Sequence, residues 1–338
     1  MTVTGAAPST ATGPLVPGAP ADLDARLRAG LEAVQRRLEE VVDHEDPFIA
    51  AANRYLIDAG GKRFRPLLTL LCAEVGSGAN DRVVDAAVAV ELTHLASLYH
   101  DDVMDEATLR RGVPSVNVAY DNSTAILVGD LLFGTASAVV ARLGPDAVLR
   151  QARTFVRLCS GQIRDDRQPG PADDPVEYYI GVLADKTGSL IATAAAYGAE
   201  FGGCDPDLVE TLTAFGEQLG VVFQLADDLL DISSEAESSG KTPGTDLREG
   251  KATLPVLYAR ASTDPADARL RELLSGPVPP EHLDEALTLL REHPAMEQAA
   301  EHTARLARET VALLDDAGDT PAIQALRSLV SGVAARSA

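Results

Sequence analysis

Apolar residues recur at helical spacing from about residue 22 to the end of the chain. One clear stripe contains Leu27, Leu31, Val34, Leu38 and Val41, the pattern of an amphipathic helix with one buried face. Helix-ending glycine and proline residues divide the pattern at Gly60-Gly61, Gly112–Pro114, Gly144-Pro145, Gly202-Gly203 and Gly276–Pro280. Alternating β-branched runs are scarce. The sequence therefore predicts an all-α fold of ten or more helices with no strand.

The helical pattern contains no linker that would divide it, so we expect a single-domain helical bundle over residues 22–338. Residues 1–21 hold several prolines and no charged side chain, which predicts a flexible N-terminal tail rather than an export signal. Two loops, Asp166–Pro175 and Ser233–Gly250, are rich in glycine and polar residues and are expected to be mobile. The second is a candidate lid because it follows an acidic cluster directly.

Composition and charge exclude several classes of function for this protein. About 46% of residues are hydrophobic, and the formal charge is −22, so the chain can form a core but repels nucleic acid and anionic membranes. The longest uncharged helical run, Thr187–Ala199, is shorter than the roughly 20 residues of a membrane span. Three scattered cysteines suit neither a disulfide framework nor a zinc site. We expect a cytoplasmic protein in which any phosphate is bound by local clusters of cations.

Two acidic clusters are the most informative feature. Asp101-Asp102-Val103-Met104-Asp105 and Asp227-Asp228-Leu229-Leu230-Asp231 each place the first and last aspartate four residues apart. On a helix these two carboxylates lie about 40° apart on one face and repel each other. A divalent cation relieves that repulsion, and Mg²⁺ typically takes one or two carboxylates together with phosphate oxygens. The two clusters therefore predict several Mg²⁺ ions around one diphosphate.

Lysine is rare in this chain, and its few positions favour anion binding. The lysines are Lys62, Lys186, Lys241 and Lys251. Lys62 lies in a glycine-rich turn with two arginines, Lys186 lies at a helix break, and the other two bracket the loop after the second acidic cluster. The ammonium group of lysine binds phosphate as a compact point charge, whereas the guanidinium of arginine is a planar fork, so the two are not interchangeable at a phosphate site. The turn lacks the spacing of a Walker P-loop, which disfavours a nucleotide triphosphatase.

These motifs resemble the trans-polyprenyl diphosphate synthases, which are head-to-tail prenyltransferases of the all-α isoprenoid-synthase fold. The resemblance covers nearly the whole chain after the tail and implies a bundle around a central substrate cavity. It rests on GGKRFRP at 60–66, ELTHLASLYHDDVMD at 91–105, RRGVPS at 110–115, KTGSL at 186–190, FQLADDLLD at 223–231 and GKTPGTDLREGKATLP at 240–255.

The resemblance implies a role for each matching residue. Three Mg²⁺ ions would be bound by Asp101, Asp102, Asp105, Asp227, Asp228 and Asp231. The allylic diphosphate would be bound by Arg110, Lys186, Thr187, Gln224, Lys241 and Lys251. Isopentenyl diphosphate would be bound by Lys62, Arg65, His94 and Arg111. The catalytic group would comprise Asp101, Asp102, Asp105, Asp227, Asp228 and Lys186.

The implied chemistry follows from charge. Metal ions and cationic side chains stabilise the departing diphosphate, and the double bond of isopentenyl diphosphate then attacks the allylic cation. A proton is lost to the released pyrophosphate, so no dedicated base is required. The family also implies a homodimer, although a heteromeric synthase is an open alternative.

Product length depends on the side chains beneath the first acidic cluster. Ala96 and Ser97 lie about one turn before Asp101, where short-chain relatives commonly carry an aromatic residue. Both are small here, which predicts a long product of about seven to ten isoprene units at roughly 5.4 Å per helical turn, of the kind used as a quinone side chain. Leu132 or Phe133 is a candidate floor of the tunnel.

Three alternatives stay open. A geranylgeranyl diphosphate synthase would stop earlier because another side chain blocks the tunnel. A class I terpene cyclase uses similar ionisation, but it needs no second diphosphate site, and cyclases typically have a different second metal motif. A non-catalytic partner subunit would generally lack aspartates, whereas both clusters are complete in this chain.

Overall fold

The computed structural model describes residues 13–167, 169–234 and 243–335 and is helical throughout most of that length. The first half contains α1 (Ala21–Val41), α2 (Pro47–Asp58), α3 (Phe64–Ala73), α4 (Asp81–Met104), α5 (Val116–Ala119), α6 (Asn122–Ala141) and α7 (Pro145–Asp165). The middle contains α8 (Pro175–Leu183), η1 (Ala184–Gly188), α9 (Ser189–Phe201) and α10 (Pro206–Ser233). The remainder contains α12 (Thr245–Glu249), α13 (Leu254–Ala261), η2 (Pro265–Asp267), α14 (Ala268–Leu273), η3 (Pro280–His282), α15 (Leu283–Glu292), α16 (Pro294–Ala312), η4 (Asp315–Ala317) and α17 (Pro321–Ala334). The predicted all-α bundle is confirmed.

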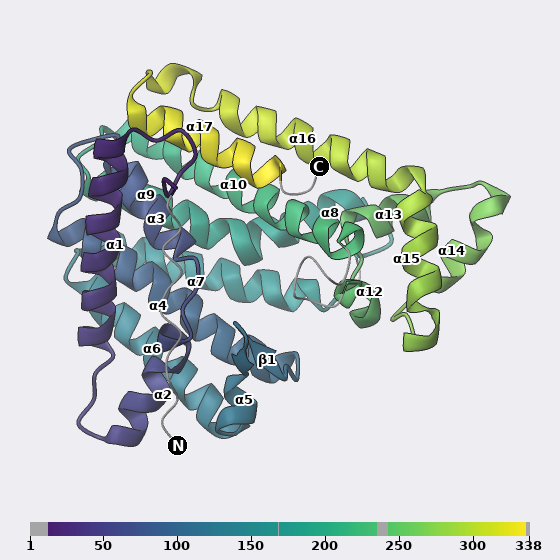
Figure 1. The fold of residues 1–338 in the computed structure, drawn as a ribbon, viewed down its shortest axis with the longest axis horizontal. Coiled ribbons are helices and arrows are strands. Elements are labelled where there is room, and N and C mark those ends of the chain that lie inside the picture. Colours follow the sequence, from purple (N-terminus) through teal and green to yellow (C-terminus); the bar gives the residue numbers. More distant parts are fainter. Residues whose placement is uncertain (1–12, 168, 235–242, 336–338) are drawn as a thin grey trace.

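Helix α9 is the centre of the bundle. Nearly all of its residues are buried, as expected for a helix that is apolar all round. It contacts α3, α4, α7 and α10 (Figure 1). A Cβ at Gly198 would lie 2.1 Å from the Thr69 carbonyl oxygen of α3, so only glycine permits this close approach of the two backbones. The long helices that carry the acidic clusters, α4 and α10, both pack on this central helix.

Capping residues fix where the two cluster-bearing helices begin. Asn80 accepts hydrogen bonds from the backbone N–H groups of Arg82 and Val83 at the start of α4. Asp205 accepts from Leu208 N–H at the start of α10, where Pro206 occupies the first helical position. These are the side chains that satisfy the free N–H groups of a first turn. Each acidic cluster therefore falls in the last turns of its helix.

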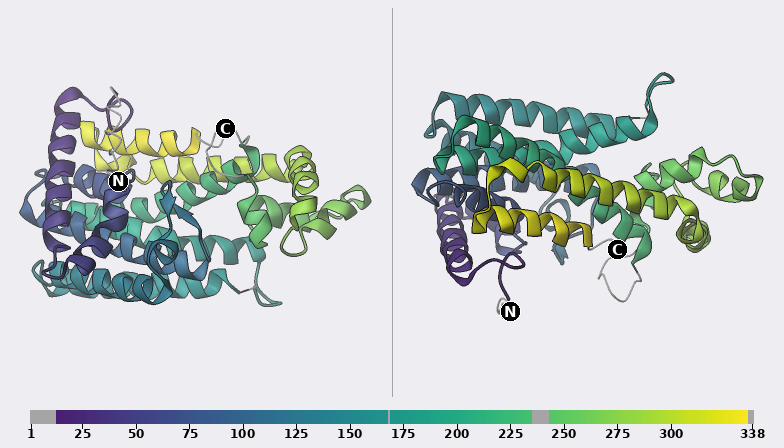
Figure 2. Two further views of the ribbon diagram at one scale, coloured as in Figure 1. Left: turned by 60° about the horizontal axis from the view of Figure 1, so that its bottom comes forward. Right: turned by 90° about the horizontal axis from the view of Figure 1, so that it is seen from above.

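The C-terminal helices lie outside this core. Helices α16 and α17 run side by side along the bundle, and α13 to α15 project from one end (Figures 1 and 2). Helix α10 contacts both α16 and α17. A second cluster of buried apolar residues, including Leu247, Val256 and Leu290, forms beneath α13 to α15. This smaller core supports the segment that covers one side of the site.

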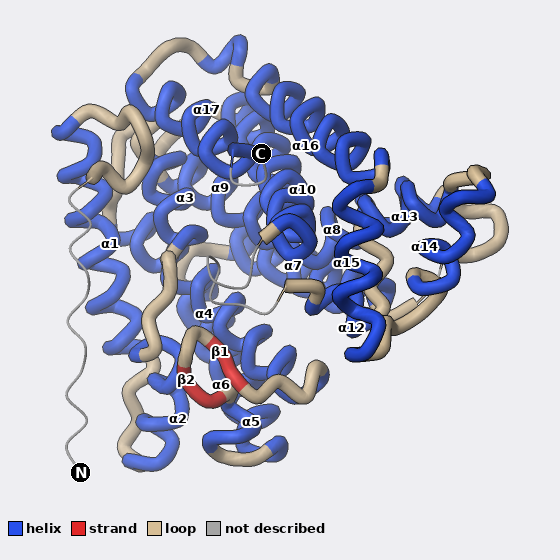
Figure 3. The backbone as a smooth tube through the Cα atoms, turned by 45° about the vertical axis from the view of Figure 1, so that its right-hand side comes forward, coloured by secondary structure: helices blue, strands red, loops and turns tan. Residues whose placement is uncertain are grey.

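The prediction of no strand was wrong at one place. Strands β1 (Leu109–Arg110) and β2 (Val113–Pro114) form a short antiparallel hairpin (Figure 3). Its two connecting residues, Arg111 and Gly112, both have positive φ, as a tight type I′ hairpin turn requires. Strands of two residues are too short to show an alternating pattern in the sequence.

Two predicted loop segments also need correction. Of the expected flexible tail, residues 13–20 are ordered: Val16 is fully buried, and the Leu15 N–H donates to Asp24 at 2.6 Å. Residues 1–12 lie outside the described residues. Of the expected mobile segment Ser233–Gly250, residues 245–249 form α12, and residues 235–242 lie outside the described part of the chain. A lid role for this segment stays a prediction.

Candidate active site

A cavity of about 640 Å³ opens between the ends of α7 and α10 and the segments α8, η1, α12 and α13. Residues from both acidic clusters and from three separate sequence motifs line it. The predicted site residues among them are Asp105, Lys186, Thr187, Gln224, Asp228 and Lys251. The structure therefore brings together residues that lie up to about 150 positions apart in the chain. Of the predicted residues, Lys241 lies outside the described part of the chain.

The first acidic cluster divides into two orientations. Asp105 ends α4 and lines the cavity. Asp101 is partly buried, and burial raises the pKa of its carboxyl to about 6. Asp102 is fully buried and turned elsewhere: its oxygens accept from Arg110 Nε at 2.6 Å and from the Val116 N–H at 2.9 Å. Asp102 is therefore held by the protein itself, and its predicted metal binding stays a prediction.

In the second cluster, by contrast, the buried aspartate lines the cavity. Asp228 is buried and accepts hydrogen bonds from Tyr179 Oη and from Gln224 Nε2. Burial, with the nearby charge of Asp246, raises its pKa to about 8. Asp231 accepts from the backbone N–H groups of Thr245 and Asp246 at 3.3 and 3.0 Å, which holds the start of α12. Asp227, which directly precedes Asp228, is partly buried.

The Glu249 carboxylate is affected by the charges of both acidic clusters. Burial, with the charges of Asp105 and Asp231, raises the pKa of Glu249 on α12. Burial and Asp231 likewise raise the pKa of Asp246 to about 7. Raised carboxyl pKa values at several neighbouring positions mean that their negative charges repel one another in a poorly solvated space. The convergence of the two clusters on one diphosphate stays a prediction, which these raised pKa values support.

Asp165 holds two of the predicted lysines. Its Oδ2 atom accepts from Lys186 Nζ at 2.8 Å and from Lys251 Nζ at 3.0 Å. Lys251 also pairs with Asp166 at 3.3 Å. Burial opposes the charge of Asp165, but the two ammonium groups outweigh it and hold the pKa of this carboxyl below its usual range. An internal carboxylate therefore occupies the point where the two lysines meet.

The residues predicted to bind isopentenyl diphosphate form a second cationic region. Burial, followed by the charges of Arg65 and Arg111, holds the pKa of His94 well below its usual value, so the imidazole is neutral at pH 7. Among the described residues, Arg65 Nε is buried without a hydrogen-bond partner, and burial lowers the pKa of Arg65 to about 10. A buried cationic N–H without an acceptor is costly. This feature points to an anion that completes the site.

Strained backbone supports this cationic region. Arg63 and Arg111 both have left-handed φ values, 46° and 53°, which non-glycine residues rarely adopt outside functional sites. Arg111 donates to the Leu56 carbonyl at 2.7 Å and to the Gly60 carbonyl. A Cβ at Gly61 would lie 2.8 Å from Arg111 Cζ, so the glycine turn leaves room for the guanidinium. Lys62 lies exposed on the same turn.

The chain-length positions lie against α6. Ala96 is fully buried, and a Cβ at Gly129 of α6 would lie 3.3 Å from its carbonyl oxygen. Ser97 Oγ donates to the His94 carbonyl at 2.8 Å. Tyr99 points away from the site and donates to the Ala52 carbonyl of α2. Phe133 packs against His100 and Phe155. The tunnel and its floor stay predictions.

The donor chemistry of the cavity fits a hard divalent cation. All the predicted metal ligands are carboxylates, and the raised pKa values of Asp101 and Asp228 show negative charge that a cation would stabilise. Within the described residues, no group of three Asp, Glu, His or Cys side chains is close enough to hold an ion. The described side chains alone therefore do not form a three-ligand site, and diphosphate oxygens would have to complete one. Metal binding by Asp102, Asp228 and Asp231 stays a prediction.

Several residues of this site carried no role in the sequence prediction. They are Arg63, Asp165, Asp166, Tyr179, Asp246 and Glu249. The Asp165-Asp166 pair at the end of an amphipathic helix is a signal that could have revealed the first carboxylate. Tyr179 gives no such signal, because an aromatic residue in an apolar helix usually belongs to the core.

Comparisons with known proteins place the fold and the family. A solved geranylgeranyl pyrophosphate synthase from Corynebacterium glutamicum, complexed with calcium and isoprenyl diphosphate, is 41% identical with a TM-score of 0.84, covering 94% of this chain and 98% of its own. A decaprenyl diphosphate synthase from Rhodobacter capsulatus is 32% identical with a TM-score of 0.85, covering 94% and 100%. The fold is therefore the all-α isoprenoid-synthase fold.

Sequence comparisons define the family. The nonaprenyl diphosphate synthase of Mycobacterium tuberculosis is 46% identical over 317 residues, which is 92% of this chain and 94% of that protein. The polyprenyl synthetase family model matches residues 46–290. The chain belongs to the polyprenyl synthetase family, and the predicted prenyltransferase function is confirmed at this level.

Proposed function

We propose that this protein is a Mg²⁺-dependent polyprenyl diphosphate synthase that adds isopentenyl diphosphate to an allylic diphosphate and releases pyrophosphate. The observation that carries the proposal is the single cavity that Asp105, Asp228, Lys186 and Lys251 share. The second cationic region around His94 supplies a separate place for the second diphosphate. Three ions would be held by Asp101, Asp102, Asp105, Asp227, Asp228 and Asp231 and would supply positive charge to the allylic diphosphate.

The bound metal ions would supply Lewis-acid stabilisation of the diphosphate leaving group. Lys186 and Lys251 bind the same group in place of Asp165, while Thr187 and Gln224 orient it from the cavity wall. The allylic C–O bond breaks, and its electron pair leaves with pyrophosphate. The double bond of isopentenyl diphosphate forms the new C–C bond, and a proton then passes from that unit to pyrophosphate.

Arg65, Arg111 and neutral His94 hold isopentenyl diphosphate during this step. The arginines pair with phosphate oxygens, and a neutral imidazole can donate one N–H without adding charge. Binding this diphosphate would satisfy the buried Arg65 N–H and lower the repulsion between Arg65 and Arg111. Lys62 on the glycine turn approaches the same group from solvent.

A long product, of the nonaprenyl or decaprenyl kind made by two of the relatives, is the proposed length. Small Ala96 and Ser97 support it, because neither blocks the space beneath Asp101. Ala96→Phe should shorten the product, measured by chromatography of dephosphorylated products; an unchanged length distribution would contradict the tunnel assignment. A geranylgeranyl product is the alternative, favoured by the Corynebacterium relative. A cytoplasmic location and a quinone side-chain role are proposed with it.

The protein is proposed to act as a homodimer packed through α6 and α7. These neighbouring helices expose large apolar side chains: Ile126, Leu127, Leu131, Val148, Leu149, Phe155, Val156 and Ile163. Helix α6 is long and apolar enough to cross a membrane by composition, and only 39% of that window is buried. A second copy that covers this face would explain its composition. Analytical ultracentrifugation should give a dimer mass.

The decisive experiment incubates the purified chain with farnesyl diphosphate, isopentenyl diphosphate and Mg²⁺. We expect a ladder of polyprenyl products that EDTA abolishes. Asp101→Asn and Asp227→Asn should each reduce turnover by about 10³-fold, since each removes a proposed metal ligand. Turnover that survives both substitutions would contradict the proposal. Cyclic hydrocarbon products would indicate a terpene cyclase, and no turnover without a second protein would indicate a partner subunit.

A further inference from the structure

The chain passes from α8 into α9 through η1, a single π-helical turn. Such turns are rare and commonly mark functional sites, because the wider turn redirects the side chains that it carries. Lys186 and Thr187 of this turn line the cavity. The preceding residue, Asp185, is not among the described residues that line it.

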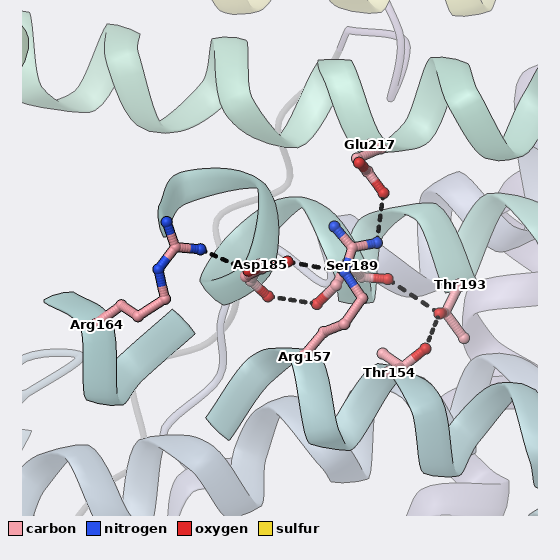
Figure 4. Close-up of polar contacts among 7 residues, drawn as sticks. All are labelled: Thr154, Arg157, Arg164, Asp185, Ser189, Thr193 and Glu217. Carbon is pink, nitrogen blue, oxygen red and sulfur yellow. Dashed lines mark hydrogen bonds and ion pairs between the residues drawn. The ribbon is translucent and has the colours of Figure 1, made fainter. Parts of the chain in front are cut away.

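Two arginines of α7, Arg157 and Arg164, hold Asp185 (Figure 4), and Arg164 also lines the cavity. Arg157 Nε donates to one of its carboxylate oxygens at 2.9 Å, and Arg164 Nη1 donates to the other at 3.1 Å. Arg157 also donates through Nη1 to Glu217 of α10 at 2.6 Å. The carboxylate of Asp185 thus connects the π-turn to α7 directly and to α10 through Arg157.

On α7 a cationic residue directly precedes an anionic one, whereas on the π-turn an anionic residue directly precedes a cationic one. Arg164 and Asp165 are consecutive on α7, and they pair with the consecutive residues Asp185 and Lys186. The Lys186–Asp165 pair lies at the cavity, where diphosphate oxygens can replace the carboxylate. Asp185 and Arg157 are not among the described residues that line the cavity, so their pair can persist while Lys186 exchanges partners.

Close backbone packing fixes the same turn on two sides. A Cβ at Gly161 of α7 would lie 2.5 Å from the Lys186 backbone nitrogen. A Cβ at Gly220 of α10 would lie 2.7 Å from the Gly188 Cα. A glycine inside a helix costs stability relative to alanine, and here it permits the turn to lie directly against both helices. The turn therefore lies close enough to both helices for Asp185 to pair with α7 and, through Arg157, with α10.

We propose that Asp185 is a positioning residue for the allylic diphosphate: its pairs with Arg157 and Arg164 orient the π-turn so that Lys186 and Thr187 face the cavity. This inference rests on the proposed function, in which Lys186 binds that diphosphate. The side chains of the network remain 22–39% exposed, so each pair is worth little in overall stability. Their contribution is to the direction of one ammonium group.

Asp185→Asn tests the proposal because it keeps the side chain's size and removes its charge. The KM for the allylic diphosphate should rise about fivefold, the effect of losing two partly exposed ion pairs. The KM for isopentenyl diphosphate and the melting temperature should stay unchanged, and Asp185→Glu should restore most of the loss. The exposed Asp146 of α7 gives a matched control, since Asp146→Asn removes the same charge without touching the network.

Two further variants keep the outcomes distinct. Arg157→Gln should also raise the allylic KM, and it carries the test if Asp185→Asn does not fold. The proposal would be overturned if these variants raised the KM values of both substrates equally. It would also be overturned if neither Asp185→Asn nor Arg157→Gln raised the allylic KM. Lys186→Ala separates this from the proposed function: an unchanged allylic KM in that variant would refute the assigned role of Lys186, whatever Asp185 does. A large effect of Lys186→Ala with none from Asp185→Asn or Arg157→Gln would refute the positioning role alone.

Discussion

The two cationic regions of this molecule balance their charge in different ways. At the cavity, Lys186 and Lys251 both pair with Asp165, so the lysines are already neutralised by the protein. Around His94, Glu91 pairs with Arg63, but Arg65 Nε remains buried without a partner. A ligand in the cavity must displace an internal anion, whereas a ligand among the arginines supplies a missing one. We therefore expect diphosphate binding in the cavity to depend on metal and binding near His94 to need none.

The largest expected effect concerns the unpartnered arginine. Arg65→Met keeps the length of the side chain and should raise the KM for isopentenyl diphosphate about 100-fold, because a buried charge-assisted contact is lost. The allylic KM should change little. Steady-state kinetics with each substrate varied in turn will measure both. Arg54→Met on α2, at a half-buried arginine that lies 3.8 Å from Asp58, is the matched control. A selective rise in the allylic KM would reverse the assignment of the two regions.

A smaller effect is expected on stability from the acidic side of the cavity. The pKa of Asp228 is raised to about 8 in the folded protein, so its charged form disfavours folding. The protonated carboxyl is compatible with folding. The stability that it allows is therefore present in full below the unfolded pKa of about 3.9 and is lost as pH rises toward 8. Asp228→Asn should remove this loss and raise the free energy of unfolding of the metal-free protein by about 2 kcal/mol at pH 8, while turnover falls.

Urea denaturation at pH 5 and pH 8 will measure this difference. The gain from Asp228→Asn should be larger at pH 8, and Asp207→Asn at the exposed start of α10 should show no such trend. A gain that shrinks as pH rises would mean that the Asp228 carboxylate is stabilised rather than strained by its surroundings.

The smallest expected effect tests the internal anion directly. Asp165→Asn frees Lys186 and Lys251, so the metal-free protein should bind pyrophosphate about fivefold more tightly, measured by calorimetry. Asp166→Asn should give a smaller gain, because Asp166 pairs with Lys251 alone, at 3.3 Å. Weaker binding by the Asp165 variant would show that this carboxylate assists the ligand instead of competing with it.

The sequence predicted the helical architecture, because long stripes such as that of Leu27 to Leu38 survive in the folded protein as a buried face. It also predicted that Asp105, Asp228, Lys186 and Lys251 converge, since these residues belong to distinctive motifs. It could not assign Asp102 and Asp228 to hydrogen-bond partners, because Val116 and Tyr179 reach them only through tertiary packing. The roles of Asp185 and Arg157 could not be predicted for the same reason, because an ion pair between segments distant in sequence leaves no local pattern.

The ordered segment before α1 has a practical consequence for anyone who shortens this protein. Val16 is fully buried, and the neighbouring Pro17 and Gly18 approach Gly332 and Ser328 of α17. A truncation at the first helical residue would uncover the apolar patch that these residues seal at the far end of the chain. Purification tags should therefore be attached before residue 13, because a truncation closer to α1 would expose an apolar surface and promote aggregation.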